Sequence, residues 1–355
     1  MQNLLGNLYS RYSAIYRYQD GVVPNSLAIG YAASGYILAL AMLLQGGRYL
    51  LPAVLLLSHS LVIAAYLLHE CTHRSLFRVP AQGQTDYHQR LATVLVWLTG
   101  ACYGRLGKIR EKHLRHHFER ADISSLDYRQ LLENRPALKT WAEFGKRCYL
   151  PAVDLLMHGL VMIRPWIDDD FKALRKRVAA VFLIRSLLFA LLAVTGGWRA
   201  LLGYALAYLL FLSVLNFMDA FQHQYLLLVG LDQDRQCSPT KDDSRFPKGY
   251  FSRDYENKHT WSNLISHRWP ALNLLVLNFP YHSIHHQRPM EPWHRLPRLH
   301  SEAMSQDDNG IQTVPLWFQI NHYFRYRMER IMAPASDRLG ETNVGAAGVS
   351  FLTPL

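Results

Sequence analysis

Long apolar stretches alternate along the chain with strongly polar ones. The first two apolar stretches cover residues 27–45 and 49–68, and a short turn with Gly46 and Gly47 joins them. Each is about 18–20 residues long, which is enough for a helix to cross roughly 30 Å of hydrocarbon. The pattern predicts two membrane-spanning helices joined as a tight hairpin.

The same pattern recurs later in the chain. Residues 178–195 and 200–221 are apolar apart from Arg185, Asp219 near the end of the second stretch and a few uncharged polar residues, and Gly196 and Gly197 separate them. We therefore predict an all-α integral membrane protein with four transmembrane helices in two hairpins. The alternative is a soluble helical protein with four buried helices, but uncharged runs of this length are difficult to bury otherwise.

Several remaining segments are predicted to lie outside the spans. The apolar runs 91–103 and 148–163 are short or interrupted by charge, which favours an interfacial or re-entrant position. Residues 333–355 are rich in Ala, Gly, Ser and Thr and are predicted to form a flexible tail. Residues 1–332 are predicted to form a single domain.

Charge indicates the orientation of the predicted spans. The chain has 38 Lys and Arg against 27 Asp and Glu, a net charge of +11. All the basic residues except Arg48, Arg185 and Arg199 fall on the side that carries both termini and residues 69–177. Because positive loops face the cytoplasm, both termini and the polar segments are predicted to be cytoplasmic. A bilayer surface, rather than nucleic acid, is the expected reason for the positive charge.

Eight of the 17 histidines fall in three short motifs. Residues at i, i+3 and i+4 share one face of a helix, so each motif presents its imidazoles in one direction. Four scattered cysteines without a CxxC pair argue against a cysteine-based zinc site. Eight imidazoles exceed the four ligands of one zinc and suit two metal ions. The motifs are His69-Glu-Cys-Thr-His73, His113-Leu-Arg-His116-His117 and His282-Ser-Ile-His285-His286.

A ninth candidate ligand, His223, follows the fourth predicted span. Asp219 precedes it by four residues, so a continuing helix would place both on one face. An ionisable residue at the end of a span is a functional candidate. The other histidines have no comparable grouping and are predicted not to be ligands; they are His59, His88, His158, His259, His267, His294, His300 and His322.

The three histidine boxes and their order between two hairpins resemble the membrane fatty acid desaturase superfamily, over roughly residues 27–300. The resemblance implies a cytoplasmic helical cap that holds two irons. The residues matching its iron ligands are His69, His73, His113, His116, His117, His223, His282, His285 and His286. Some members carry an asparagine where this chain has Asp219, which is therefore expected to ligate iron directly and to influence the reaction.

The resemblance also implies the chemistry. The expected activity is O2-dependent attack on a C–H bond of a fatty acid or fatty acyl chain, with O2 as cosubstrate. Electrons are expected from a separate donor, such as a ferredoxin or a cytochrome b5. Desaturation is the expected reaction; hydroxylation and oxidative decarboxylation of a free fatty acid to a terminal alkene share the scaffold, and no residue decides between them. Expected supporting carboxylates are Glu70, Glu111, Asp122 and Asp127.

Two other functions fit part of the sequence. His69-Glu70-Cys-Thr-His73 matches the H-E-x-x-H motif of zinc proteases, with Glu70 as general base. That interpretation leaves both HxxHH boxes unexplained. A histidine-rich protein that binds metal without catalysis is a further alternative. Basic residues around the second box favour either an anionic head group or a solvated basic face; they are Arg105, Lys108, Arg110, Lys112 and Arg115.

Overall fold

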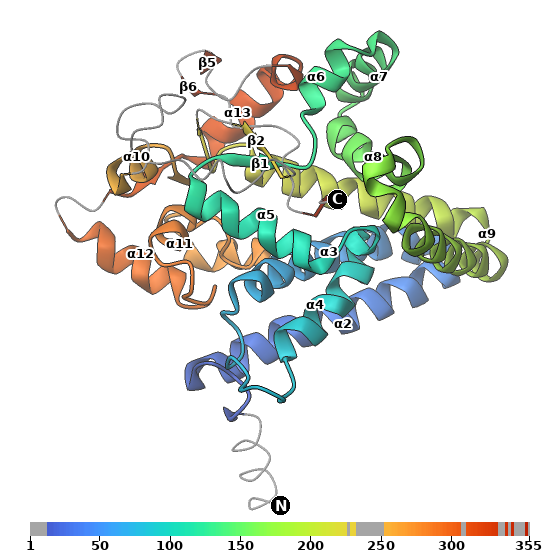
Figure 1. Cartoon of the computed structure of the whole chain (residues 1–355). Helices are drawn as coiled ribbons and strands as arrows, with labels where there is room; N and C mark the ends of the chain where they lie inside the picture. The colour runs from blue at the N-terminus through green and yellow to red at the C-terminus, as the bar shows by residue number, and fades with distance from the viewer. Residues whose placement is uncertain are drawn as a thin grey trace, which may run out of the picture.

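The structure is a computed structural model that describes residues 13–225, 228–231, 252–306, 310–332, 338–339, 342–343 and 352–353. It is mostly helical, with a few short strands (Figure 1). Within the described part, three helical stretches are long and apolar enough to cross a membrane: Gln19–Gln45, Gly47–His73 and Asp169–Asp219. They cover all four sequence-predicted spans.

The first hairpin consists of α2 (Val22–Gln45) and α3 (Leu50–His73), which pack against each other. They approach closely at Gly35, where an added Cβ would clash with the Ser60 hydroxyl oxygen. Helix α3 does not stop at the end of the apolar stretch. It continues through the first box, so His69 and His73 lie on its last turns.

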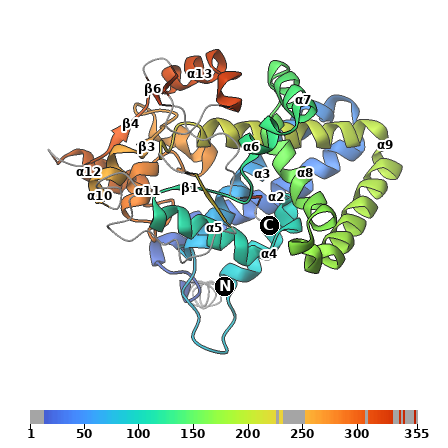
Figure 2. The same ribbon diagram turned by 45° about the horizontal axis from the view of Figure 1, so that its top comes forward.

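The second hairpin is one helical stretch, α9 (Arg175–Asp219), with a sharp bend. Gly197 has φ 70° and ψ −178°, a backbone conformation that glycine adopts without steric cost and other residues rarely adopt. This residue divides α9 into two arms that diverge from a corner (Figure 2). The two predicted helices are therefore present, and the turn between them is reduced to one non-helical residue.

Five short helices connect the two hairpins. In chain order they are α4 (Tyr87–Leu98), α5 (Leu106–Glu119), α6 (Tyr128–Glu133), α7 (Pro136–Arg147) and α8 (Ala152–Ile167). The end of α4 contacts the first arm of α9, because Arg185 donates a hydrogen bond to the Trp97 carbonyl at 2.9 Å. Helix α5 carries the second box.

The segments after α9 pack beside the helices between the two hairpins, and together these parts form the cap. The helices of the described segments after α9 are α10 (Arg253–Lys258), α11 (His282–Gln287), α12 (Leu296–Met304) and α13 (Leu316–Arg325). Strand β1 (Asp122–Ser124) pairs in parallel with β2 (Leu228–Gly230), and β3 (Trp261–Ser262) pairs in parallel with β4 (Gln312–Thr313). These pairings bring distant segments beside the second and third boxes.

Most of the expected flexible tail, residues 333–355, lies outside the described residues. Within it, β5 (Arg338–Leu339) pairs with β6 (Thr342–Asn343) in an antiparallel hairpin. Further along, Thr353 is buried, and its carbonyl accepts a hydrogen bond from the Ser125 hydroxyl at 3.0 Å. Leu352 and Thr353 are therefore packed against the rest of the protein.

Candidate metal centre

Nine histidines from distant parts of the chain converge at the junction of the hairpins and the cap. They form two groups, and within each group one ring nitrogen per residue lies within 4.8 Å of the others. All nine histidines singled out from the sequence are present, and none of the other eight belongs to either group. The first group is His69, His73, His113, His117 and His285; the second is His116, His223, His282 and His286.

The boxes are divided between the two groups. On α5, His113 and His117 are four residues apart and join the first group, whereas His116 turns to the second. On α11, His285 joins the first group, and His282 and His286 join the second. Because an α-helix has 3.6 residues per turn, consecutive histidines such as His116 and His117 point in different directions around the helix axis, which explains the division. Neither group is complete without residues from at least two boxes.

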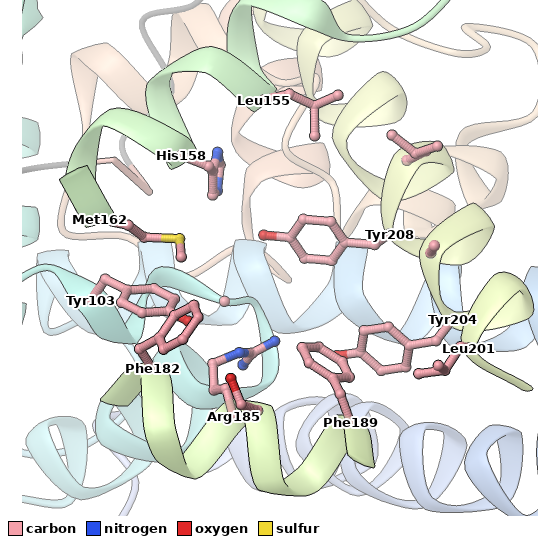
Figure 3. A pocket seen from close by; sticks show the side chains of 14 residues that line it. Tyr103, Leu155, His158, Met162, Phe182, Arg185, Phe189, Leu201, Tyr204 and Tyr208 are labelled. Atoms are coloured by element: carbon pink, nitrogen blue, oxygen red, sulfur yellow. The ribbon is translucent and has the colours of Figure 1, made fainter. Parts of the chain in front are cut away.

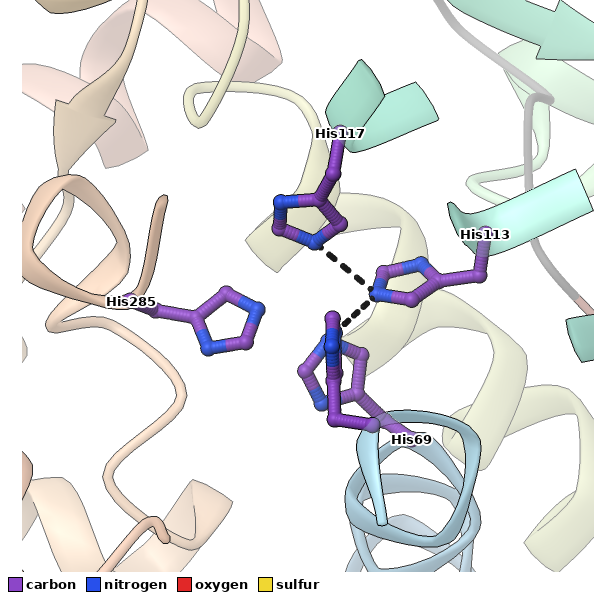
Figure 4. A group of neighbouring side chains, drawn as sticks. His69, His113, His117 and His285 are labelled. Atoms are coloured by element: carbon purple, nitrogen blue, oxygen red, sulfur yellow. Dashed lines mark hydrogen bonds between the residues drawn. The ribbon is translucent and has the colours of Figure 1, made fainter. Parts of the chain in front are cut away.

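Ring contacts show how close the side chains are. In the first group, the Nε2 atom of His113 lies 2.6 Å from that of His73. It lies 3.1 Å from the Nε2 atom of His117, and Figure 4 marks this contact with a dashed line. In the second, the Nε2 atom of His223 lies 2.6 Å from that of His282. The rings of His117 and His286 stack between the groups at a centroid distance of 4.0 Å. The two groups are therefore adjacent halves of one site.

Hydrogen-bond partners outside the histidine groups orient the rings of His116 and His286, and a third ring, that of His69, lies near a carboxylate at a longer distance. The Nδ1 atom of His116 lies 2.8 Å from the Ala121 carbonyl oxygen, which directs Nε2 into the site. The Nδ1 atom of His286 lies 3.1 Å from the Glu256 carboxylate, and that of His69 lies 3.5 Å from the Glu70 carboxylate. Metal-ligating histidines commonly donate their second ring N–H to a carbonyl or carboxylate in this way.

The supporting carboxylates differ in part from the sequence prediction. Among the four candidates, Glu70 reaches a histidine of the site. Glu111 instead forms an ion pair with Lys108, Asp127 caps the first turn of α6, and Asp122 is buried in β1. Glu256 was not singled out, because it lies on α10 in a polar segment without a recognisable motif. Its proximity to the third box arises only in the folded chain.

Asp219 does not join either histidine group. The sequence prediction placed Asp219 and His223 on one helix face, which requires the helix to continue for another turn. Helix α9 ends at Asp219, and His223 instead forms an isolated β-bridge with Thr260. The i, i+4 spacing therefore no longer sets the relative direction of the two side chains.

The histidine site favours neutral imidazoles. Burial lowers the pKa of His116 to about 4 and holds the pKa of His113, His117 and the third-box histidines well below the usual value. Both ring nitrogens of His285 and the Nε2 atom of His286 are buried without a hydrogen-bond partner among the described residues. Neutral imidazole nitrogens directed at a common point are suitable ligands for a transition metal. The residues present therefore fit two metal ions.

Comparison with known families agrees with this geometry. The model of the family "Fatty acid desaturase" matches residues 48–319, a range that contains all three boxes and His223. The chain belongs to the fatty acid desaturase family. A comparison with curated proteins gives no match. Family membership and the histidine cluster together indicate a desaturase-like oxidoreductase in a bilayer environment.

The lowered histidine pKa values predict acid sensitivity in this desaturase-family protein without metal. Between about pH 6.5 and 4 the unfolded chain binds more protons than the folded chain at His116, so acid favours unfolding. Raised pKa values of Asp122, to about 7, and Asp154, to about 6, act in the opposite direction, but the histidines outnumber them. We expect Tm of iron-free protein to fall by several degrees over this range. The fall should be at least as large after iron loading, because bound iron keeps the same imidazoles unprotonated in the folded chain. Calorimetry showing a Tm that does not fall between pH 6.5 and 4 would contradict this expectation.

Proposed function

We propose that the protein is an O2-dependent, non-haem di-iron oxidoreductase that attacks a C–H bond of a fatty acid or fatty acyl chain. One observation carries the proposal: nine histidines form two adjacent groups where membrane-length hairpins meet the cap. The family match adds the substrate class, because a fatty acyl chain is the expected substrate of a fatty acid desaturase. Metal binding without catalysis does not account for that match.

The nine histidines are proposed to hold the two irons, one in each group. Bound iron supplies the activation of O2 that makes attack on an unactivated C–H bond feasible. The Ala121 carbonyl and the Glu256 carboxylate hold the rings of His116 and His286 in one orientation. Glu70, whose carboxylate lies 3.5 Å from the His69 Nδ1 atom, is proposed to do the same for His69. Burial of the rings excludes bulk water from the site.

We further propose four membrane crossings, two of them the arms of α9, within a single domain over residues 1–332. The concentration of basic residues outside the spans supports a cytoplasmic position for both termini and the histidine site. Electrons are proposed to come from a separate donor. The exposed side chains of Arg105 and Arg110, on either side of the start of α5, suit an acidic protein of that kind.

Desaturation is the proposed reaction, and product analysis tests it. Membranes containing the protein would receive fatty acids, iron, O2 and a reducing system, and extract and headspace would be analysed by gas chromatography–mass spectrometry. We expect an unsaturated product of unchanged carbon number. A hydroxylated product, or a terminal alkene one carbon shorter, would assign the alternative reactions on the same scaffold. Absence of any oxidised product with iron bound would contradict the proposal.

The zinc-protease interpretation of the first box is disfavoured by the surroundings of Glu70. Its carboxylate accepts hydrogen bonds from the Ser75 hydroxyl at 2.6 Å and the Trp293 backbone N–H at 3.1 Å. A general base in a protease would instead face a water on the metal. His69 and His73 also join three histidines from the other boxes.

A substitution of Glu70 separates the two functions. In a protease, Glu70→Gln should abolish activity, because no other group replaces the base. In the proposed oxidoreductase it should lower acyl oxidation by about 10–100-fold, the usual effect of removing a group that orients a ligand. The assay is product formation at matched iron content, with Glu291→Gln as the control carboxylate of the third-box region. Unchanged oxidation would exclude Glu70 as the group that orients His69.

Asp219 is proposed to act through charge rather than as a ligand. Burial lowers the pKa of Lys112 to about 7, and the charges of Asp219, Asp122 and Asp154 act in the opposite direction. In Asp219→Asn we expect two irons per chain as in the wild type. The cost in unfolding free energy should be smaller than the ~3–5 kcal/mol of breaking an isolated buried pair, since two carboxylates remain. Loss of one iron would show instead that Asp219 ligates metal.

A further inference from the structure

Two apolar cavities within the membrane-length part of the structure are not part of the histidine site. The larger, of 650 Å³, lies between α8, the residues after α4 and the two arms of α9 (Figure 3). The smaller, of 460 Å³, lies between α2, α4 and the arms of α9. Both volumes fall in the range of about 300–1,000 Å³ that is typical of small-molecule sites. Arg185, Phe189 and Tyr204 line both cavities, so the two meet at these side chains.

Arg185 is the cation at this meeting point. Figure 3 shows its guanidinium between Phe182 and Phe189 on one arm, with Tyr204 and Tyr208 on the other. Its Nη1 atom donates to the Trp97 carbonyl oxygen at 2.9 Å, and its guanidinium lies 5.3 Å from the Phe189 ring centroid. Among the described residues no aspartate or glutamate forms an ion pair with it. The Trp97 carbonyl is uncharged, so its hydrogen bond does not neutralise the positive charge of Arg185.

A charge in this position is costly without an anion. Arg185 lies near the middle of the first arm, about 15 Å along the helix from either end. An arginine at the centre of a span is expensive and is retained where it has a function. A guanidinium has five N–H donors, and its bonds to the Trp97 carbonyl, to Cys102 Sγ at 4.0 Å and to Tyr204 are all to neutral groups, which leaves donors for a carboxylate. The lining of the larger cavity is otherwise apolar apart from tyrosine hydroxyls, Ser186 and His158.

We propose that this paired cavity binds a free fatty acid, with the carboxylate on Arg185 and the hydrocarbon chain in the apolar cavities. The inference goes beyond the proposed function, because it concerns binding at membrane depth rather than reaction at the histidines. A fatty carboxylate fits better than a phospholipid. A phosphate head group remains in the interface, whereas a protonated fatty acid enters hydrocarbon and can ionise beside the guanidinium.

Binding of radiolabelled palmitate to the purified, iron-loaded protein in micelles tests the proposal. We expect wild-type protein to bind palmitate at least ten times more tightly than methyl palmitate, which has the same chain without the charge. Arg185→Gln should lose that difference through weaker palmitate binding. The matched control is Arg199→Gln, because Arg199 is an exposed arginine of α9 outside both cavities and its loss should change nothing.

A second variant keeps the test valid if Arg185→Gln does not fold. Ala205 lines the larger cavity and is exposed, so Ala205→Phe fills space without disturbing a packed core. It should weaken binding of palmitate and of the ester together. Equal wild-type affinity for acid and ester, or unchanged palmitate binding in Ala205→Phe, would overturn the proposal. Displacement of palmitate by phosphatidylglycerol at equal concentration would also overturn the proposal, because it would show that the cavity accepts any anionic lipid.

Iron content, measured on the same samples, separates this inference from the proposed function. Normal palmitate binding by a protein that holds no iron would contradict the di-iron proposal and leave the fatty acid site standing. A protein that holds two irons but binds palmitate no more tightly than methyl palmitate would contradict the fatty acid site and leave the di-iron proposal standing.

Discussion

Replacing His285 by alanine should abolish turnover and remove iron from the first histidine group. Both ring nitrogens of His285 are buried without a hydrogen-bond partner among the described residues, so its side chain has no structural bond to lose. Removal of a group that only supports a ligand already costs about 10–100-fold in metal affinity or activity, and loss of a ligand should exceed this. We expect acyl oxidation to fall by more than 100-fold, with iron content near one per chain.

The matched control is His267→Ala. His267 is exposed and belongs to neither histidine group, so both iron and turnover should be unchanged. Thermal unfolding of both variants in the presence of chelator checks that the fold is intact. If His285→Ala keeps two irons and full turnover, the assignment of the first group as a metal site is wrong.

Glu256→Gln should weaken the second iron by about 10–100-fold, because Glu256 orients and polarises His286 from behind. One of its carboxylate oxygens accepts hydrogen bonds from Arg120 at 3.2 Å and from Arg253 at 2.6 Å. The amide keeps the shape of the side chain but removes its charge. Two guanidinium groups then remain beside the ring without the anion that offsets them, which makes His286 a poorer ligand.

Chelator titration of the iron-loaded protein measures this effect. Glu256→Gln should lose one iron at about 10–100-fold lower chelator concentration than the wild type, with the other iron retained. The control is Glu302→Gln, which removes an exposed carboxylate that pairs with Arg298. Identical titration curves for wild type and Glu256→Gln would show that the contact with His286 has no part in holding metal.

The sequence was sufficient for the histidine ligand candidates and for the helical hairpins. The expectation that each box presents its imidazoles in one direction was wrong: His113 and His117 join the first group, whereas His116 joins the second. Apolar length predicted α2, α3 and both arms of α9. His223 was singled out from its position after the fourth predicted span and from the family resemblance; its expected helical alignment with Asp219 is absent, because α9 ends at Asp219.

Features that depend on where a helix ends, or on contacts between distant segments, were not predictable. Asp219 was expected beside His223 because no sequence signal marked the end of α9 between them. Glu256 reaches His286 only through the folding of the segment between the second hairpin and the third box. The pairing of Arg338–Leu339 with Thr342–Asn343 lies in a composition typical of a loose tail.

The metal content of the purified protein tests the di-iron site most directly. Inductively coupled plasma mass spectrometry on protein expressed with iron and zinc both available should give two irons per chain and little zinc. Two adjacent groups of five and four histidines can each hold a metal ion, and the proposed acyl oxidation requires iron. A single zinc per chain, retained through purification, would contradict the di-iron site and favour the protease interpretation of the first box.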